Sequence, residues 1–209
     1  MKKKAIVFFV LIFVFTFILN KNKNQSVFFK YLPKKKKMKY KYTEDFYLSK
    51  IEPAEREIFD KKISEICKEL GLKKIDLLAL MYIESGLKPK AVNKFTNATG
   101  LIQFIPSTAK KLGTTVEDLF KMNATEQLFY VRKYFLPFKG KIKNIYDLYL
   151  AAFFPAAIGK PNDYILQTKK LSAEKIANQN KAVDKDKNNK ITKREVIDWV
   201  NKKVFVFEK

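Results

Sequence analysis

Glu84 is the acidic residue whose neighbours suit it best for chemistry. It follows an apolar run with helical spacing at residues 77–82, and Gly86 behind it is a typical helix stop. A carboxylate at the C-terminal end of a helix meets the negative end of the helix dipole, and apolar neighbours further disfavour its charged form. We therefore expect a raised pKa at Glu84, as a general acid for glycosidic bond cleavage requires. The alternative is a solvated glutamate without a catalytic role.

A second block, GLIQFIPSTA at residues 100–109, follows the sequence ESG at residues 84–86. Together these blocks resemble the soluble lytic transglycosylase (SLT) domain of the lysozyme-like superfamily. In that family the glutamate is the catalytic acid and base, and the Gly-Leu-Ile-Gln block lines the sugar cleft opposite it. The resemblance therefore implies that Glu84 is the catalytic residue. The substrate-binding residues predicted with it are Ser85, Gly100, Leu101, Ile102, Gln103, Phe104, Tyr149 and Phe153.

Residues 147–159 stand where SLT domains carry an Ala-Tyr-Asn-Ala-Gly-like motif, whose tyrosine helps to position the catalytic glutamate. Phe153 and Phe154 occupy the places of the Tyr-Asn pair, and phenylalanine has no hydroxyl that could bind a carboxyl. Either another group such as Tyr146 or Tyr149 takes over this role, or packing alone holds the glutamate. The sequence PAAIGKP that follows resembles phage-encoded transglycosylases instead.

The acidic residues near this site are too few for ordinary glycoside hydrolysis. That reaction needs a second Asp or Glu across the sugar, and none lies between Ser85 and Thr115. The resemblance implies cleavage of the β-1,4 bond between N-acetylmuramic acid and N-acetylglucosamine in peptidoglycan. A single glutamate fits transglycosylation, in which the sugar's own 6-hydroxyl attacks and leaves a 1,6-anhydro end. The alternatives are a goose-type hydrolysing muramidase and a non-catalytic, membrane-anchored wall-binding or virion structural protein.

The composition excludes several other kinds of catalysis. The 209 residues carry a net charge of +22 and contain no histidine. The charge favours an anionic partner, but no nucleic-acid motif accompanies it, so no specific nucleic acid is expected. Without histidine, Ser-His-Asp and Cys-His catalysis and His-containing zinc sites are excluded. Cys67, the one cysteine, lies in a helical pattern and is interpreted as a buried apolar residue. Acid–base chemistry must therefore come from carboxylates, without any cofactor.

A different set of residues, DKDKNNKITKRE at 184–195, has the spacing of an EF-hand calcium loop. Asn189 replaces the glycine of the sharp turn, and asparagine tolerates a positive φ better than most residues. Five basic residues in the loop should lower its affinity. We expect a structural calcium site that holds the C-terminal helix, and the alternative is a solvated Lys/Asp/Asn tail. The predicted ligands are Asp184, Asp186, Asn188, the carbonyl of Lys190, and Glu195.

An apolar run at residues 5–19, with lysines on both flanks, predicts a membrane segment. The run is short for a span of about 20 residues, but flanking lysines can snorkel to the headgroups. No small-x-small cleavage site follows it. We expect residues 1–23 to form an uncleaved transmembrane helix, with a cleaved signal sequence or a buried core helix as alternatives. The catalytic domain would then face the periplasm or cell wall, or the anchor would lie in a virion membrane.

The rest of the chain divides by composition into three parts. Residues 24–42 are basic and aromatic, which predicts a linker that can also hold anionic lipid or wall polymer. Residues 43–180 are predicted to form the catalytic domain, a lysozyme-like, mostly α fold with at most a small β-hairpin near residues 88–99. Residues 181–209 add the calcium loop and a C-terminal helix. Helical patterns occur near residues 54–70, 74–85, 106–112, 125–136 and 144–154.

Overall fold

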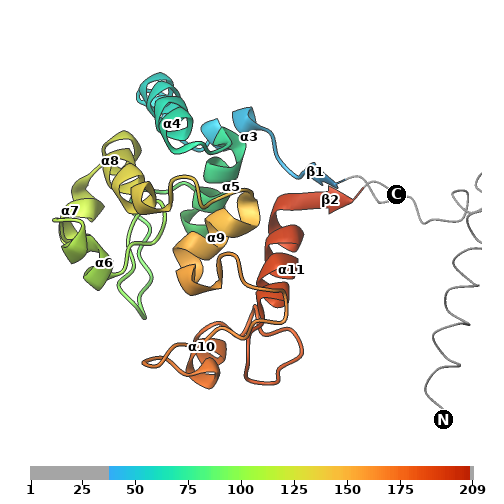
Figure 1. The fold of residues 1–209 in the computed structure, drawn as a ribbon. Helices are drawn as coiled ribbons and strands as arrows, with labels where there is room; N and C mark the ends of the chain where they lie inside the picture. Colours follow the sequence, from blue (N-terminus) through green and yellow to red (C-terminus); the bar gives the residue numbers. More distant parts are fainter. Residues whose placement is uncertain (1–37, 208–209) are drawn as a thin grey trace, which may run out of the picture. The chain divides into compact units, whose positions relative to one another are not determined.

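The computed structural model describes residues 38–207 as a mostly helical fold (Figure 1). The predicted anchor at residues 1–23 lies outside the described residues, as does the predicted linker up to residue 37. Within residues 38–207, no helix has both the length and the hydropathy needed to cross a membrane. In chain order the elements are β1 (Met38–Tyr40), α3 (Glu44–Leu48), α4 (Arg56–Leu70), α5 (Lys74–Ser85), α6 (Pro106–Lys111), α7 (Val116–Lys121), α8 (Ala124–Phe135), η1 (Leu136–Phe138), α9 (Ile145–Phe153), η2 (Pro155–Ala157), α10 (Ala173–Gln179), α11 (Lys193–Val204) and β2 (Phe205–Phe207).

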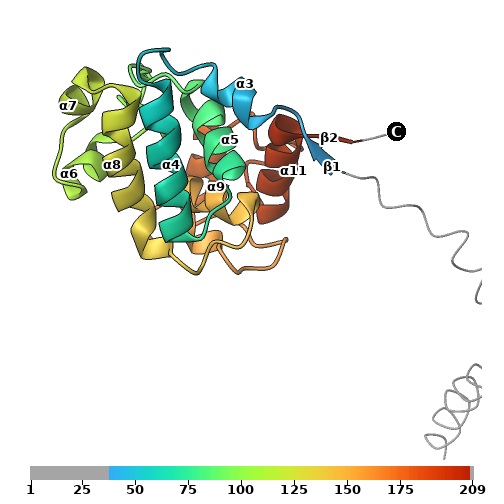
Figure 2. The ribbon, with the colours of Figure 1, turned by 90° about the horizontal axis from the view of Figure 1, so that it is seen from above.

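Helix α5 lies at the centre of the fold and packs against α3, α4 and α9. Six consecutive residues of this helix, Asp76–Met81, are buried. A helix that is apolar on all sides belongs in a core, so its neighbours must surround it. Figure 2 shows α4 and α8 side by side next to α5, and the contacts between α4 and α8 agree with this view. The mostly α architecture predicted from the sequence is confirmed, and it fits a lysozyme-like domain.

The ends of several helices are fixed by local hydrogen bonds that the sequence encodes. Asn123 and Glu126 form a reciprocal capping box at the start of α8, and Thr192 and Glu195 form another at the start of α11. At the C-terminal end of α5, Gly86 adopts a left-handed φ of 66°, and its N–H donates to carbonyls of the last turn. Glu84 is therefore held in the final turn of a well-terminated helix.

The one sheet within residues 38–207 joins the two ends of the described chain. β1 and β2 pair antiparallel, with Lys39 opposite Val206. The Tyr40 hydroxyl donates a hydrogen bond to the buried carboxylate of Asp76 on α5, which ties this sheet to the central helix. Residues 38–42 were assigned to the linker by composition, but the pairing makes them part of the folded unit. Residues 88–99, where a hairpin was considered, contain only isolated bridges.

The C-terminal segment shares the core of the domain. Helix α11 packs against α9, and Val196, Val200 and Val204 are fully buried or nearly so. In the preceding loop, Ile191 is fully buried, and its carbonyl accepts a hydrogen bond of 2.8 Å from the N–H of Leu166. Residues 181–207 therefore fold as an integral part of the same unit and not as a separate tail.

Candidate active site

Glu84 sits in the last turn of α5, where it is half-buried. Burial raises its pKa from the ordinary value of 4.5 to about 7. The sequence-based expectation of a raised pKa is confirmed, and its cause is desolvation of the charged form. At neutral pH the carboxyl is thus divided between its acid and base forms.

Two tyrosines on other helices lie close enough to Glu84 for its negative charge to raise their pKa values. Tyr149 of α9 is buried, and burial together with the negative charge of Glu84 raises its pKa. The same two causes raise the pKa of Tyr134 of α8. The Tyr134 hydroxyl donates to the carbonyl of Ala151 at 2.9 Å, which ties α8 to α9. Both phenol rings therefore form part of the Glu84 environment.

Of the two tyrosines considered from the sequence, Tyr146 and Tyr149, only Tyr149 has a pKa that the charge of Glu84 raises. The Tyr146 hydroxyl donates to Asn201 Oδ1 at 2.6 Å and so serves the contact between α9 and α11. Tyr149 also lies beside α11, because Trp199 is among the groups that influence its pKa, and its ring packs against Phe153 with ring centroids 5.9 Å apart. Tyr134 was not singled out from the sequence, because it lies in an apolar stripe that resembles any core face. Only its position relative to Glu84 distinguishes it.

The block at residues 100–104 is held in place by Gln127, a fully buried amide of α8. Its Oε1 accepts the N–H of Leu101 at 2.9 Å, and its Nε2 donates to the carbonyls of Pro89 and Leu119 at 2.7 and 2.8 Å. Gly100 has a φ of 84°, and a Cβ there would lie 2.4 Å from Gln127 Oε1. Gly100 is therefore required both by the backbone conformation and by the close approach of the amide.

Ser85 connects this block to the helix that carries Glu84. Its Oγ lies 2.9 Å from the carbonyl oxygen of Leu101 and 3.0 Å from that of Met81. The hydroxyl proton is shared between the loop and the helix's own last turn. Ser85 was predicted to bind substrate, and in the structure its contacts are with the backbone. It fixes the distance between Glu84 and the 100–104 block.

The remaining residues predicted to bind substrate divide into core and surface groups. Leu101, Ile102 and Phe104 are 0%, 6% and 1% exposed, so their side chains pack in the core. Any contact of these three residues with a sugar would therefore be made by their backbone, and their role in substrate binding stays a prediction. Gln103 stays partly exposed, with a left-handed φ of 54°, and its Nε2 donates to the carbonyl of Gly100 at 3.1 Å.

A surface hollow that sequence reasoning missed lies next to this block. Its volume is about 310 Å³, and Glu84 does not line it. Thr99, which immediately precedes Gly100, is part of its wall, so the hollow adjoins the block without including the acid. No sequence signal identifies it, since its walls come from a loop and from α7. The lining residues are Val92, Asn97, Thr99, Val116, Glu117, Phe120 and Lys121.

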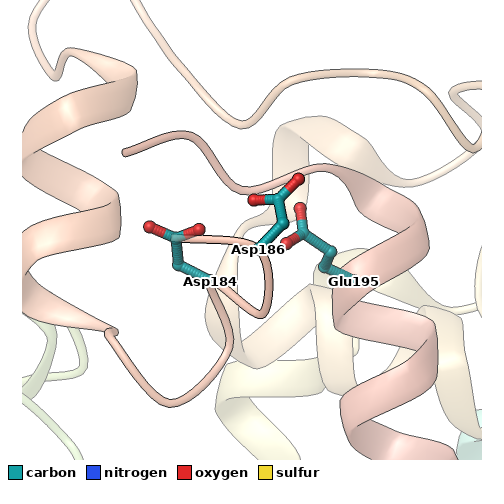
Figure 3. A group of neighbouring side chains, drawn as sticks. All are labelled: Asp184, Asp186 and Glu195. Carbon is teal, nitrogen blue, oxygen red and sulfur yellow. The ribbon is translucent and has the colours of Figure 1, made fainter. Parts of the chain in front are cut away.

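The predicted metal ligands also come together, at the start of α11 (Figure 3). Asp184, Asp186 and Glu195 each offer a carboxylate oxygen, and these oxygens lie within 4.8 Å of one another. Asn189 has a φ of 62°, so it adopts the conformation for which a glycine is usual at this place. Asn188 Oδ1 accepts the N–H of Lys190 at 2.9 Å, which closes the turn. This cluster is the one group within residues 38–207 with several carboxylates able to hold a metal ion.

Comparison with known families finds a match in the central part of the chain. Residues 63–130 match the family model described as the transglycosylase SLT domain. The match begins within α4 and ends within α8, so it includes Glu84, Ser85, the 100–104 block and Gln127. Among curated proteins, none matches this chain. The match supports the lytic transglycosylase superfamily, whose members cleave glycosidic bonds in peptidoglycan glycan strands.

Proposed function

We propose that this protein is a lytic transglycosylase in which Glu84 is the only catalytic carboxylate. The bond cleaved is the β-1,4 linkage between N-acetylmuramic acid and N-acetylglucosamine. The observation that carries the proposal is the raised pKa of Glu84, about 7, within the segment that matches the SLT domain. A group with this pKa is about half protonated at neutral pH. It can donate a proton in one step and accept one in the next.

The reaction needs no second carboxylate from the protein. Glu84 gives its proton to the glycosidic oxygen as the bond from the anomeric carbon breaks, and the N-acetylglucosamine side leaves as an alcohol. The resulting carboxylate then takes the proton of the muramic acid 6-hydroxyl, whose oxygen attacks the anomeric carbon. The product is a 1,6-anhydro ring, and Glu84 returns to its protonated form. The lack of any acidic residue between Ser85 and Thr115 supports this single-carboxylate scheme.

Tyr149 takes the place of the family tyrosine as a positioning residue in this scheme. Phe153, at the position of that tyrosine, has no hydroxyl, but it packs against the Tyr149 ring. Tyr149 lies within electrostatic range of Glu84. It belongs to α9, as Phe153 does, and precedes Phe153 by one helical turn. The backbone of the 100–104 block, held by Gln127 and Ser85, provides the opposite side of the site.

The decisive experiment is mass spectrometry of peptidoglycan digested with the full chain. The expected products carry 1,6-anhydro-N-acetylmuramic acid ends, and Glu84→Gln should lower their rate of formation at least about a hundredfold. Reducing muramic acid ends would instead identify a hydrolysing muramidase. Wall binding without any released fragment would identify a non-catalytic wall-binding or virion structural protein.

The location proposed for this activity follows from the N-terminal sequence. We assign residues 1–23 as a membrane anchor and the basic residues that follow as a contact for anionic lipid or wall polymer. An anchored enzyme cuts peptidoglycan only within reach of its tether, which suits local opening of the wall. A phage virion is one setting in which such local cleavage is useful, in keeping with the resemblance of residues 155–161 to phage-encoded forms.

A further inference from the structure

The carboxylate cluster at the start of α11 contains a buried oxygen that no protein group satisfies. Asp184 is 7% exposed, and its Oδ1 has no hydrogen-bond partner. Three other buried side-chain atoms of residues 38–207 share this lack of a partner, but none of them belongs to an acid. Leaving a buried polar atom unpaired costs about 1–3 kcal/mol, and more for a charged group. A carboxylate oxygen in this state indicates a missing positive partner.

The other oxygens of the cluster are already used by the loop itself. Asp184 Oδ2 accepts the N–H of Asn189 at 3.1 Å, and Glu195 Oε1 accepts the N–H of Lys185 at 3.0 Å. Glu195 Oε2 accepts from the backbone and hydroxyl of Thr192, both at 2.9 Å. Asp186 accepts the N–H and the side-chain amide of Asn188 at 3.2 and 2.9 Å, so hydrogen bonds hold all three acidic side chains in spite of their mutual repulsion. The loop is thus arranged before any ion binds.

None of the basic side chains nearby pairs with the cluster. The loop holds four lysines and one arginine, yet it forms no salt bridge within the described part of the chain. Lys193, the most buried of them, points its Nζ to the carbonyl of Lys160 at 2.7 Å. The positive charge that the cluster lacks is therefore not supplied by its own neighbours.

We propose that this loop binds a calcium ion. The ligands are Asp184, Asp186, Glu195, the side-chain oxygen of Asn188 and the carbonyl of Lys190, all of them hard oxygen donors. Calcium takes six to eight such ligands in flexible loops, whereas magnesium demands a stricter octahedral shell. The basic residues of the loop repel the ion, so we expect a dissociation constant on the order of 0.1–1 mM, as in weak extracellular sites.

The ion stabilises the C-terminal helix against the helix that carries Tyr149. Glu195 belongs to the first turn of α11, and α11 packs against α9. The same loop contributes the buried Ile191 and pairs with residues 164–166 through its backbone. Binding to the folded loop alone must therefore raise the free energy of unfolding of the whole unit.

The test is a calcium titration of the full chain, followed by thermal unfolding and by calorimetry. At a tenfold excess over the dissociation constant, the midpoint of unfolding should rise by about 3–6 °C. Fluorescence of Trp199, the single tryptophan and a residue of α11, reports the same event locally. Sodium chloride at equal ionic strength is the reference, because screening alone affects a chain of net charge +22.

Two conservative variants separate calcium binding from folding. Glu195→Gln retains a group able to form the capping box of α11 but removes the charge, and Asp184→Asn keeps an acceptor for the N–H of Asn189. Both should fold and should lose the calcium-dependent shift. Glu126→Gln, the same change in the capping box of α8, should keep the full shift. The proposal is overturned if calcium gives no heat and no shift in the full chain, or if the shift survives in Asp184→Asn and Glu195→Gln.

Discussion

The burial of Glu84 predicts that neutralising this residue stabilises the folded protein at high pH. Its carboxyl has a pKa of about 7 in the folded state against an ordinary value of 4.5. A group whose pKa is higher in the folded state binds more protons there, so the free energy of unfolding falls as the pH rises from about 4.5 to about 7. This difference in pKa corresponds to about 3 kcal/mol of folding stability, which the protonated carboxyl provides at low pH and which is fully lost above pH 7.

Glu84→Gln replaces the carboxyl by a neutral group of nearly the same shape and so removes this cost. Relative to the parent chain, the variant should be more stable by up to about 3 kcal/mol at pH 8, or about 6–12 °C in the unfolding midpoint. At pH 4 the stabilisation should be absent, because the parent carboxyl is then protonated in the folded state. Such a gain on removing a functional group is typical of strained or desolvated active sites.

The assay is thermal or urea unfolding of both proteins at pH 4, 6 and 8. Glu65→Gln, on the exposed side of α4, is the matched control and should show a difference that does not change with pH. A stability difference between Glu84→Gln and the parent that stays constant from pH 4 to pH 8 would refute the argument. It would mean that the Glu84 carboxyl is solvated.

Three further predictions concern the site and the N-terminus. Tyr149→Phe should lower turnover by about tenfold to a hundredfold and shift the pH profile, whereas Tyr146→Phe should leave the profile unchanged because its hydroxyl bonds to α11. In urea unfolding, Gly100→Ala should destabilise the fold by at least about 2 kcal/mol more than Gly71→Ala. Both glycines have a positive φ, but only a Cβ at residue 100 would displace the buried amide of Gln127. Equal losses of stability in the two variants would contradict this close approach. Intact-mass analysis of the membrane fraction should find residues 5–19 retained, and a soluble protein that begins within residues 20–30 would disprove the anchor.

The local features of this fold could be read directly from the sequence. The helical spacing around residues 77–82 and the glycine at 86 placed the end of α5, and the helix agrees with that expectation. The raised pKa of Glu84 was also predictable, because a glutamate that ends an apolar helix has few ways to reach water. The loop at residues 184–195 was predictable for a similar reason. Its acidic residues recur at short, fixed intervals, and the chain geometry alone brings them together.

The features that depend on distant segments could not be predicted in this way. Composition placed residues 38–42 in a linker, and only the pairing of β1 with β2 at the other end of the chain makes them part of the fold. The family resemblance named Leu101 and Phe104 as substrate-binding residues, and only the structure shows that both side chains lie in the core beneath their turn. A turn has an inner and an outer side, and the sequence of the turn does not say which side meets the rest of the protein.

The sequence by itself indicated that Glu84 has a raised pKa and that it ends an apolar helix. Those properties arise from neighbours within one or two helical turns, where hydrophobic spacing and capping act. Only the tertiary structure decided which hydroxyls accompany Glu84, because Tyr134 and Tyr149 come from two separate helices. It also decided that the buried amide of Gln127 holds the 100–104 block, through hydrogen bonds to three segments at once. Such contacts depend on how helices pack across the core, and that packing is a property of the whole chain.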